Sequence, residues 1–114
     1  MRPGDKDAAN LHDMLEVARE ARELVAEIEV AAFLRDRVSR RALERMLELI
    51  GEAARRITPA CQAEHPEIPW RRIIGQRNIL AHEYGRIDPK LLYRTAREDM
   101  PSLIAALERI FPGP

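Results

Sequence analysis

The sequence contains a single cysteine and no long run of apolar residues. Cys61 alone cannot form an intrachain disulfide, which fits a chain that works in a reducing cytosol. A membrane-spanning helix needs about 18 or more consecutive apolar residues, and the sequence has no such run. The first ten residues, MRPGDKDAAN, lack the apolar segment of a secretory signal. We therefore expect a cytoplasmic protein.

The chain also lacks a net charge, which argues against a strongly basic nucleic-acid-binding protein. The charges are nevertheless unevenly distributed. Residues 1–36 contain five Lys or Arg and nine Asp or Glu, a net of −4, whereas residues 37–114 contain fourteen and ten, a net of +4. Seven basic residues lie between Pro69 and Arg97, with only two acidic ones. A local basic surface is one interpretation of this stretch, and a solvated helix face is the other.

Aromatic residues, valine and threonine are scarce, and the predominance of Leu, Ile, Ala, Glu and Arg favours helices over strands. Residues 1–114 are expected to form one domain. Apolar residues recur at three- and four-residue steps over residues 7–29 and 37–57, which predicts two long helices with a short helical turn between them. Small residues at Gly51 and at 53–54 would let another helix approach the second one closely.

Prolines divide the second half of the chain. Residues 58–69 contain three prolines and form the main connection, with one short helical turn after Thr58. Pro69 can begin a third helix over residues 70–84, and Gly85 would end it.

A fourth helix is predicted to start at Asp88 and Pro89, an N-cap followed by a proline at the first helical position. Pro101 should interrupt this helix, and residues 101–111 form a last helical piece. The sequence therefore predicts an all-α fold, an antiparallel bundle of four to five helices.

Four polar side chains gather near the end of the predicted third helix, in the stretch RNILAHEY at residues 77–84. At 100° per residue, Arg77 lies in the middle of the apolar stripe of this helix. A charge there is costly unless it is paired or faces a cleft or a partner chain. Glu48 and Glu52 of the second helix are both candidates for its counter-ion, and solvated pairing within their own helix is the alternative.

Arg77 and His82 are five residues apart, or about 140° around an ideal helix, so they cannot meet on one face of one regular helix. Either the helix ends near His82, or two copies of the chain bring the side chains together. This spacing is a physical reason to expect a dimer. Asn78 lies four residues before His82, on a neighbouring face.

These residue types suit the cleavage of an RNA phosphodiester without a metal, with the 2′-hydroxyl as nucleophile. His82 can act as general base or acid near neutral pH, and Arg77 offers a fork of donors for phosphate oxygens. Asn78 can orient the imidazole or a phosphate, and Tyr84 offers a hydroxyl. No Asp and Glu cluster near His82 resembles a two-metal site. The alternative is structural, with Asn78 and His82 capping a helix end and Arg77 pairing with an acidic residue.

Arg77, His82 and Tyr84 form the pattern Arg-x4-His-x-Tyr, with Asn78 directly after the arginine. This pattern resembles the HEPN superfamily, specifically the HepT-like toxins of HEPN/MNT toxin–antitoxin pairs. The similarity extends over most of the chain. It includes LELIGEAARRI at 47–57, EHPEIPWRRIIGQRNILAHEYGRID at 64–88 and DMPSLIAALERI at 99–110.

The resemblance implies a homodimeric helical bundle with Arg77 and His82 lining a cleft at the two-fold axis. It implies a metal-independent RNase toxin without a cofactor, in which Arg77 and His82 are catalytic and Asn78 and Tyr84 support them. It also implies a partner, a minimal nucleotidyltransferase antitoxin that transfers AMP from ATP to Tyr84 and silences the toxin. The alternative function is a catalytically inactive helical binding partner of a nucleotidyltransferase, and a plain dimeric scaffold is a third.

Overall fold

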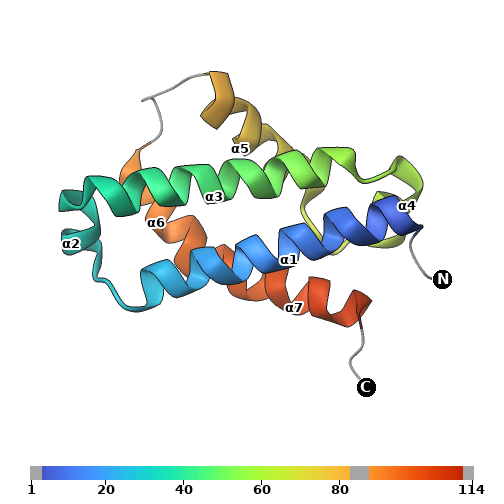
Figure 1. Ribbon diagram of the computed structural model, residues 1–114, viewed down its shortest axis with the longest axis horizontal. Helices are drawn as coiled ribbons and strands as arrows, with labels where there is room; N and C mark the ends of the chain where they lie inside the picture. The colour runs from blue at the N-terminus through green and yellow to red at the C-terminus, as the bar shows by residue number, and fades with distance from the viewer. Residues whose placement is uncertain (1–3, 83–87, 112–114) are drawn as a thin grey trace.

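A computed structural model describes residues 4–82 and 88–111, without the side chains of residues 81 and 82. All the regular elements in these ranges are helical, which confirms the predicted all-α fold (Figure 1). They are α1 (Asp5–Ala26), α2 (Val30–Arg35), α3 (Arg37–Arg56), α4 (Pro59–Glu64), α5 (Trp70–His82), α6 (Pro89–Arg94), the π-helical turn η1 (Thr95–Asp99) and α7 (Met100–Ile110). Over the described ranges, none of these helices combines the length and apolar character needed to cross a membrane.

Helix α3 is the centre of the arrangement, packed against α1 on one side and α5 on the other (Figure 1). Helix α7 packs against α1, and α6 and η1 continue into α7. The molecule measures 45 × 33 × 19 Å, so its shortest dimension is about two helix diameters. In this thin arrangement α5 packs mainly on α3 and forms one edge of the bundle.

The core contains the apolar stripes that the sequence predicts. Its largest fully buried side chains come from α1, α2, α3, α6 and α7 and from the connection before α5: Leu11, Met14, Val25, Phe33, Leu43, Ile50, Ile68, Leu92 and Leu107. Trp70, at the start of α5, is also buried, and its indole N–H donates to the carbonyls of Gln62 and His65 at 3.1 and 3.0 Å. These bonds fix the beginning of α5 against the end of α4.

The short helix predicted after Thr58 is present as α4. The Thr58 hydroxyl oxygen accepts a bond from the backbone N–H of Cys61 at 3.3 Å, and Pro59 occupies the first turn. The buried carboxylate of Asp7 accepts bonds from the backbone N–H and hydroxyl of Thr58, at 3.0 and 2.7 Å. The start of α4 is therefore tied to the first turn of α1.

Helices α6 and α7 are joined directly by the π-helical turn η1. Asp88 caps α6 by accepting a bond from the N–H of Lys90 at 2.9 Å, as predicted. The regular helix is interrupted next to Pro101, as expected, but the irregular turn lies just before the proline. The irregular turn is η1, where the N–H of Met100 bonds to the carbonyl of Thr95, and Pro101 lies in the first turn of α7. A proline is tolerated there because N–H groups of a first turn have no helical partner, and the wider π turn absorbs the change of register.

Two side chains of this C-terminal segment fix the end of α1. The Tyr93 hydroxyl donates to the carbonyl of Ile28 at 2.7 Å, and Arg97 donates to the carbonyl of Val25 at 3.1 Å. The Arg97 guanidinium also lies over the Tyr93 ring, 5.9 Å from its centroid. These bonds tie the C-terminal end of α1, and the residue that follows its C-cap, to the segment formed by α6 and η1.

Candidate active site

Arg77 lies on the face of α5 that packs against α3, directly over Gly51. A Cβ atom at Gly51 would lie 2.1 Å from the Cβ of Arg77 and 3.0 Å from the carbonyl oxygen of Ile73. A side chain at this position would therefore push the two helices apart. The close approach predicted at Gly51 is confirmed, and it determines where the stem of Arg77 lies.

The Arg77 guanidinium pairs with Glu52, one of the two predicted counter-ions. Its Nη2 lies 3.9 Å from Oε1 of Glu52, and the two side chains are only 13% and 24% exposed. Glu48 pairs instead with Arg45 at 3.0 Å, and Arg45 also approaches Glu52 at 3.9 Å. The contact between Arg77 and Glu52 is too long for a hydrogen bond, so it compensates the charge without consuming a donor.

The remaining donors of Arg77 are only partly used. Nη1 donates to Oδ1 of Asn78 at 3.1 Å. Nε is buried and has no acceptor among the described residues. An unpaired buried donor costs about 1–3 kcal/mol, and such groups are uncommon in folded proteins. The N–H donors that the guanidinium leaves unused are suited to hydrogen bonds with phosphate oxygens.

His82 is the last residue of α5 that the structure describes, and the helix end expected at Gly85 lies outside the described residues. The side chain of His82 lies outside the part of the chain that the structure describes, as does all of Tyr84. Because α5 is regular from Trp70 to His82, the positions of Arg77 and His82 remain about 140° apart around the helix. The meeting of their side chains therefore stays a prediction, as does the role of Tyr84.

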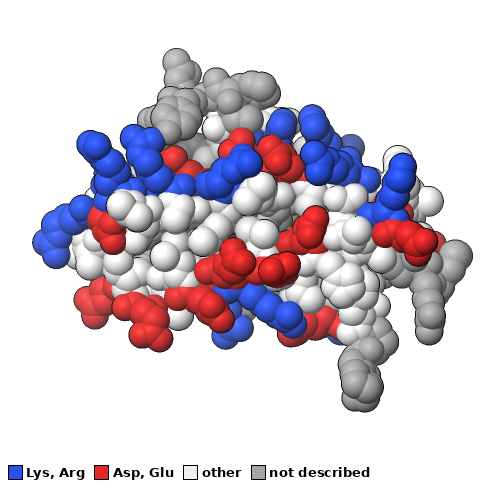
Figure 2. All heavy atoms as spheres, in the orientation of Figure 1, with Lys and Arg blue, Asp and Glu red and all other residues white. Residues whose placement is uncertain are grey.

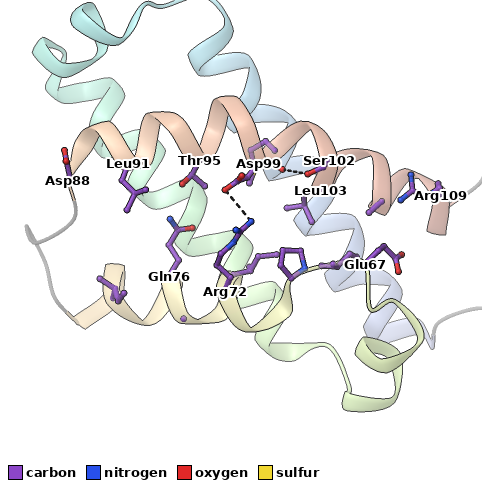
Figure 3. A pocket seen from close by; sticks show the side chains of 17 residues that line it. Glu67, Arg72, Gln76, Asp88, Leu91, Thr95, Asp99, Ser102, Leu103 and Arg109 are labelled. Carbon is purple, nitrogen blue, oxygen red and sulfur yellow. Dashed lines mark hydrogen bonds and ion pairs between the residues drawn. The ribbon is translucent and has the colours of Figure 1, made fainter.

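A groove of about 940 Å³ lies between α5 and the segment formed by α6, η1 and α7 (Figure 3). Its walls are mainly apolar and include Ile79 and Leu91. Figure 3 shows Arg72 of α5 pointing across the groove toward Asp99 of η1, with which it pairs at 3.6 Å. Arg77 does not line the groove, which lies on a different face of α5. The groove is not predictable from the sequence, because its two walls are distant in the chain.

The uneven charge distribution of the sequence becomes a spatial separation in the fold. Figure 2 shows Lys and Arg side chains gathered along the α3 edge and Asp and Glu side chains along the α1 edge. Two basic residues near the motif nevertheless have structural partners, because Arg72 pairs with Asp99 and Arg97 donates to the carbonyl of Val25. Within residues 4–82 and 88–111, no group of three or more His, Cys, Asp or Glu side chains could hold a metal ion.

Comparison with known proteins assigns the family. The family described as Ribonuclease HepT-like matches residues 14–110. The chain is 38% identical over 100 residues to "Putative RNase MJ1380" of Methanocaldococcus jannaschii, covering 88% of this chain and 92% of that protein. It is also 38% identical over 100 residues to "Probable ribonuclease HepT" of Thermococcus cleftensis, covering 88% and 91%. No solved structure matches significantly. The chain belongs to the HepT-like ribonuclease family, and the resemblance read from its sequence is confirmed.

Proposed function

We propose that this chain is a metal-independent endoribonuclease in which Arg77 and His82 carry the reaction. The observation that supports this most directly is the state of Arg77. Its guanidinium is largely buried, charge-compensated by Glu52 and incompletely hydrogen-bonded among the described residues. It lies five residues before His82 in the motif of a ribonuclease family. The names of the relatives, which describe them as RNases, support the same substrate class.

His82 and Arg77 would have different roles in one displacement reaction at phosphorus. His82 would take the proton of the RNA 2′-hydroxyl while the 2′-oxygen forms a bond to phosphorus. Arg77 would stabilise the negative charge that grows on the phosphate oxygens. The bond from phosphorus to the 5′-oxygen then breaks, and that oxygen takes a proton from water while His82 returns its proton to the solvent. The products are a 2′,3′-cyclic phosphate and a free 5′-hydroxyl. Asn78, which accepts a bond from Arg77, would restrict the rotation of the guanidinium.

The proposal includes a homodimer that covers the groove. Ile79 and Leu91 line this groove and are 42% and 47% exposed, although both are large and apolar. They come from opposite walls, so a second copy related by a two-fold axis could bury both at once. Such a dimer would place the two α5 helices near the axis. We propose separately that Arg77 of one copy works with His82 of the other, which would remove the 140° separation as an obstacle.

The last part of the proposal is control by a partner. We propose that the chain is the toxin of a toxin–antitoxin pair in the cytoplasm, neutralised by a nucleotidyltransferase that transfers AMP to Tyr84. The support is the complete motif of the resemblance, in which Tyr84 follows His82 by two residues, in a chain that belongs to the HepT-like family. An added phosphate and adenosine beside Arg77 would repel RNA and block its access.

Cleavage of a labelled RNA by the purified chain in the presence of EDTA tests the nuclease proposal. The wild type should cut the RNA and leave cyclic phosphate ends. Arg77→Ala and His82→Ala should each lower the rate by about 10²–10⁴-fold with unchanged helical content. Arg71→Ala, which removes an exposed arginine from the same helix, is the control and should keep most of the activity.

Three outcomes would contradict this proposal in different ways. Loss of cleavage in EDTA would overturn the metal-independent mechanism. Unfolding of His82→Ala would favour a structural capping role for His82. A wild type that binds its nucleotidyltransferase but cuts no RNA would support the alternative function, a catalytically inactive binding partner.

A further inference from the structure

We infer that Glu52 is a positioning residue for Arg77, and this inference rests on the proposed RNA cleavage. Glu52 directly follows Gly51, the residue over which the Arg77 stem packs. Its carboxylate is therefore placed beside the guanidinium by the same helix contact that brings α5 onto α3. The separation of 3.9 Å between Nη2 and Oε1 constrains the guanidinium and leaves its donors for a phosphate.

The surroundings of the pair make this constraint effective. Both side chains are mostly buried, so solvent and salt screen their attraction less than that of an exposed pair. Among the described residues, the other partner of the guanidinium is Asn78, an exposed neighbour on the same helix. Without Glu52, the end of the long arginine side chain would be held only by this exposed amide. The expected consequence is a guanidinium that reaches the phosphate less often in the productive orientation.

Glu48 provides a matched control on the same helix. It lies one turn before Glu52, and its side chain is 21% exposed against 24% for Glu52. It pairs with Arg45 at 3.0 Å, and no contact with Arg77 is found for it among the described residues. A loss of charge at Glu48 therefore reproduces the change in net charge and helix propensity, and it removes a direct partner of Arg45 rather than of Arg77.

The test is a comparison of single-turnover cleavage by the full chain and its variants. Glu52→Gln should lower the maximal rate about 10–100-fold, with a smaller change in the RNA concentration at half-saturation. Glu48→Gln should cleave like the wild type. Glu52→Asp, which keeps the charge but withdraws it by one methylene, should fall between Glu52→Gln and the wild type. Thermal unfolding of each variant shows whether the fold is retained.

A double-mutant cycle separates positioning from a general structural effect. If Glu52 acts through Arg77, Glu52→Gln should cause no further loss in an Arg77→Ala background. An additive loss there, or an unchanged or faster rate for Glu52→Gln alone, would overturn the inference while leaving the nuclease proposal intact. A wild type that cuts no RNA would overturn the nuclease proposal, and this inference with it.

Discussion

Gly51 on α3 and Arg77 on α5 are in direct contact, because the missing side chain of the glycine leaves room for the arginine stem. A Cβ atom at Gly51 would lie 2.1 Å from the Cβ of Arg77 and 2.8 Å from its Cγ. The same contact brings Glu52 within 3.9 Å of the guanidinium. One glycine thus determines both how closely the helices pack and where the proposed catalytic arginine lies.

Gly51→Ala should therefore separate α5 from α3 and reduce cleavage. Overpacking at such a contact costs about 1–3 kcal/mol, and the higher helix propensity of alanine offsets about 1 kcal/mol of it. Urea unfolding and the RNA assay measure the two effects. Gly75→Ala is the control, because a Cβ there would meet no described atom within 4 Å, so the fold should tolerate it. A Gly51→Ala protein with both wild-type stability and wild-type cleavage would contradict the observed contact.

The local features of this fold are predictable from the sequence because they depend on neighbouring residues. The caps at Thr58 and Asp88 and the close approach at Gly51 follow from residue type and spacing. The sequence does not determine whether Glu48 or Glu52 pairs with Arg77, because the pairing depends on how α3 and α5 cross. The groove and the bonds from α6 and η1 to the end of α1 join segments that are distant in the chain, and periodicity carries no information about them.

The proposed dimer predicts complementation between two inactive variants. If Arg77 of one copy works with His82 of the other, a heterodimer of Arg77→Ala and His82→Ala contains one intact site. Mixing the two variants, with exchange of subunits, should then restore roughly a quarter of the wild-type activity. Each variant alone should stay inactive. No recovery after demonstrated exchange would show that each site is built within one chain.

The proposed dimer contact at the groove leads to a prediction about the oligomeric state. Ile79→Lys combined with Leu91→Lys should convert the dimer to monomers, because both side chains line the groove and would carry charge into the interface. Light scattering at micromolar concentration measures this. Val38→Lys is the control, because Val38 is 78% exposed on α3 and does not line the groove. A wild type that is monomeric at this concentration would refute the dimer itself.

Because Cys61 is buried, we expect its thiol to react slowly with alkylating reagents in the folded chain. Burial raises the pKa of Cys61 above its ordinary value of 9.0, and the negative charges of Asp7 and Glu64 act in the same direction. The folded chain therefore favours the neutral thiol. This contribution to stability is fully present below pH 9.0 and is lost as the pH rises through the folded-state pKa. Iodoacetamide at pH 8–9 should label the native chain much more slowly than the urea-unfolded chain. Equal labelling rates would contradict the burial of this side chain.

The proposed modification can be tested with the two tyrosines of the chain. Incubation with the cognate nucleotidyltransferase and ATP should add one or more AMP groups to Tyr84 and abolish RNA cleavage, because the new phosphate competes with RNA for Arg77. Tyr84→Phe should keep part of the cleavage activity, since Arg77 and His82 remain, and should escape silencing. Tyr93→Phe is the matched control, because the Tyr93 hydroxyl is bound to the carbonyl of Ile28 at 2.7 Å and should not accept AMP. Intact mass and peptide mapping locate the added groups. If the active partner still silences Tyr84→Phe completely, inhibition comes from complex formation alone and the modification of Tyr84 is not its cause.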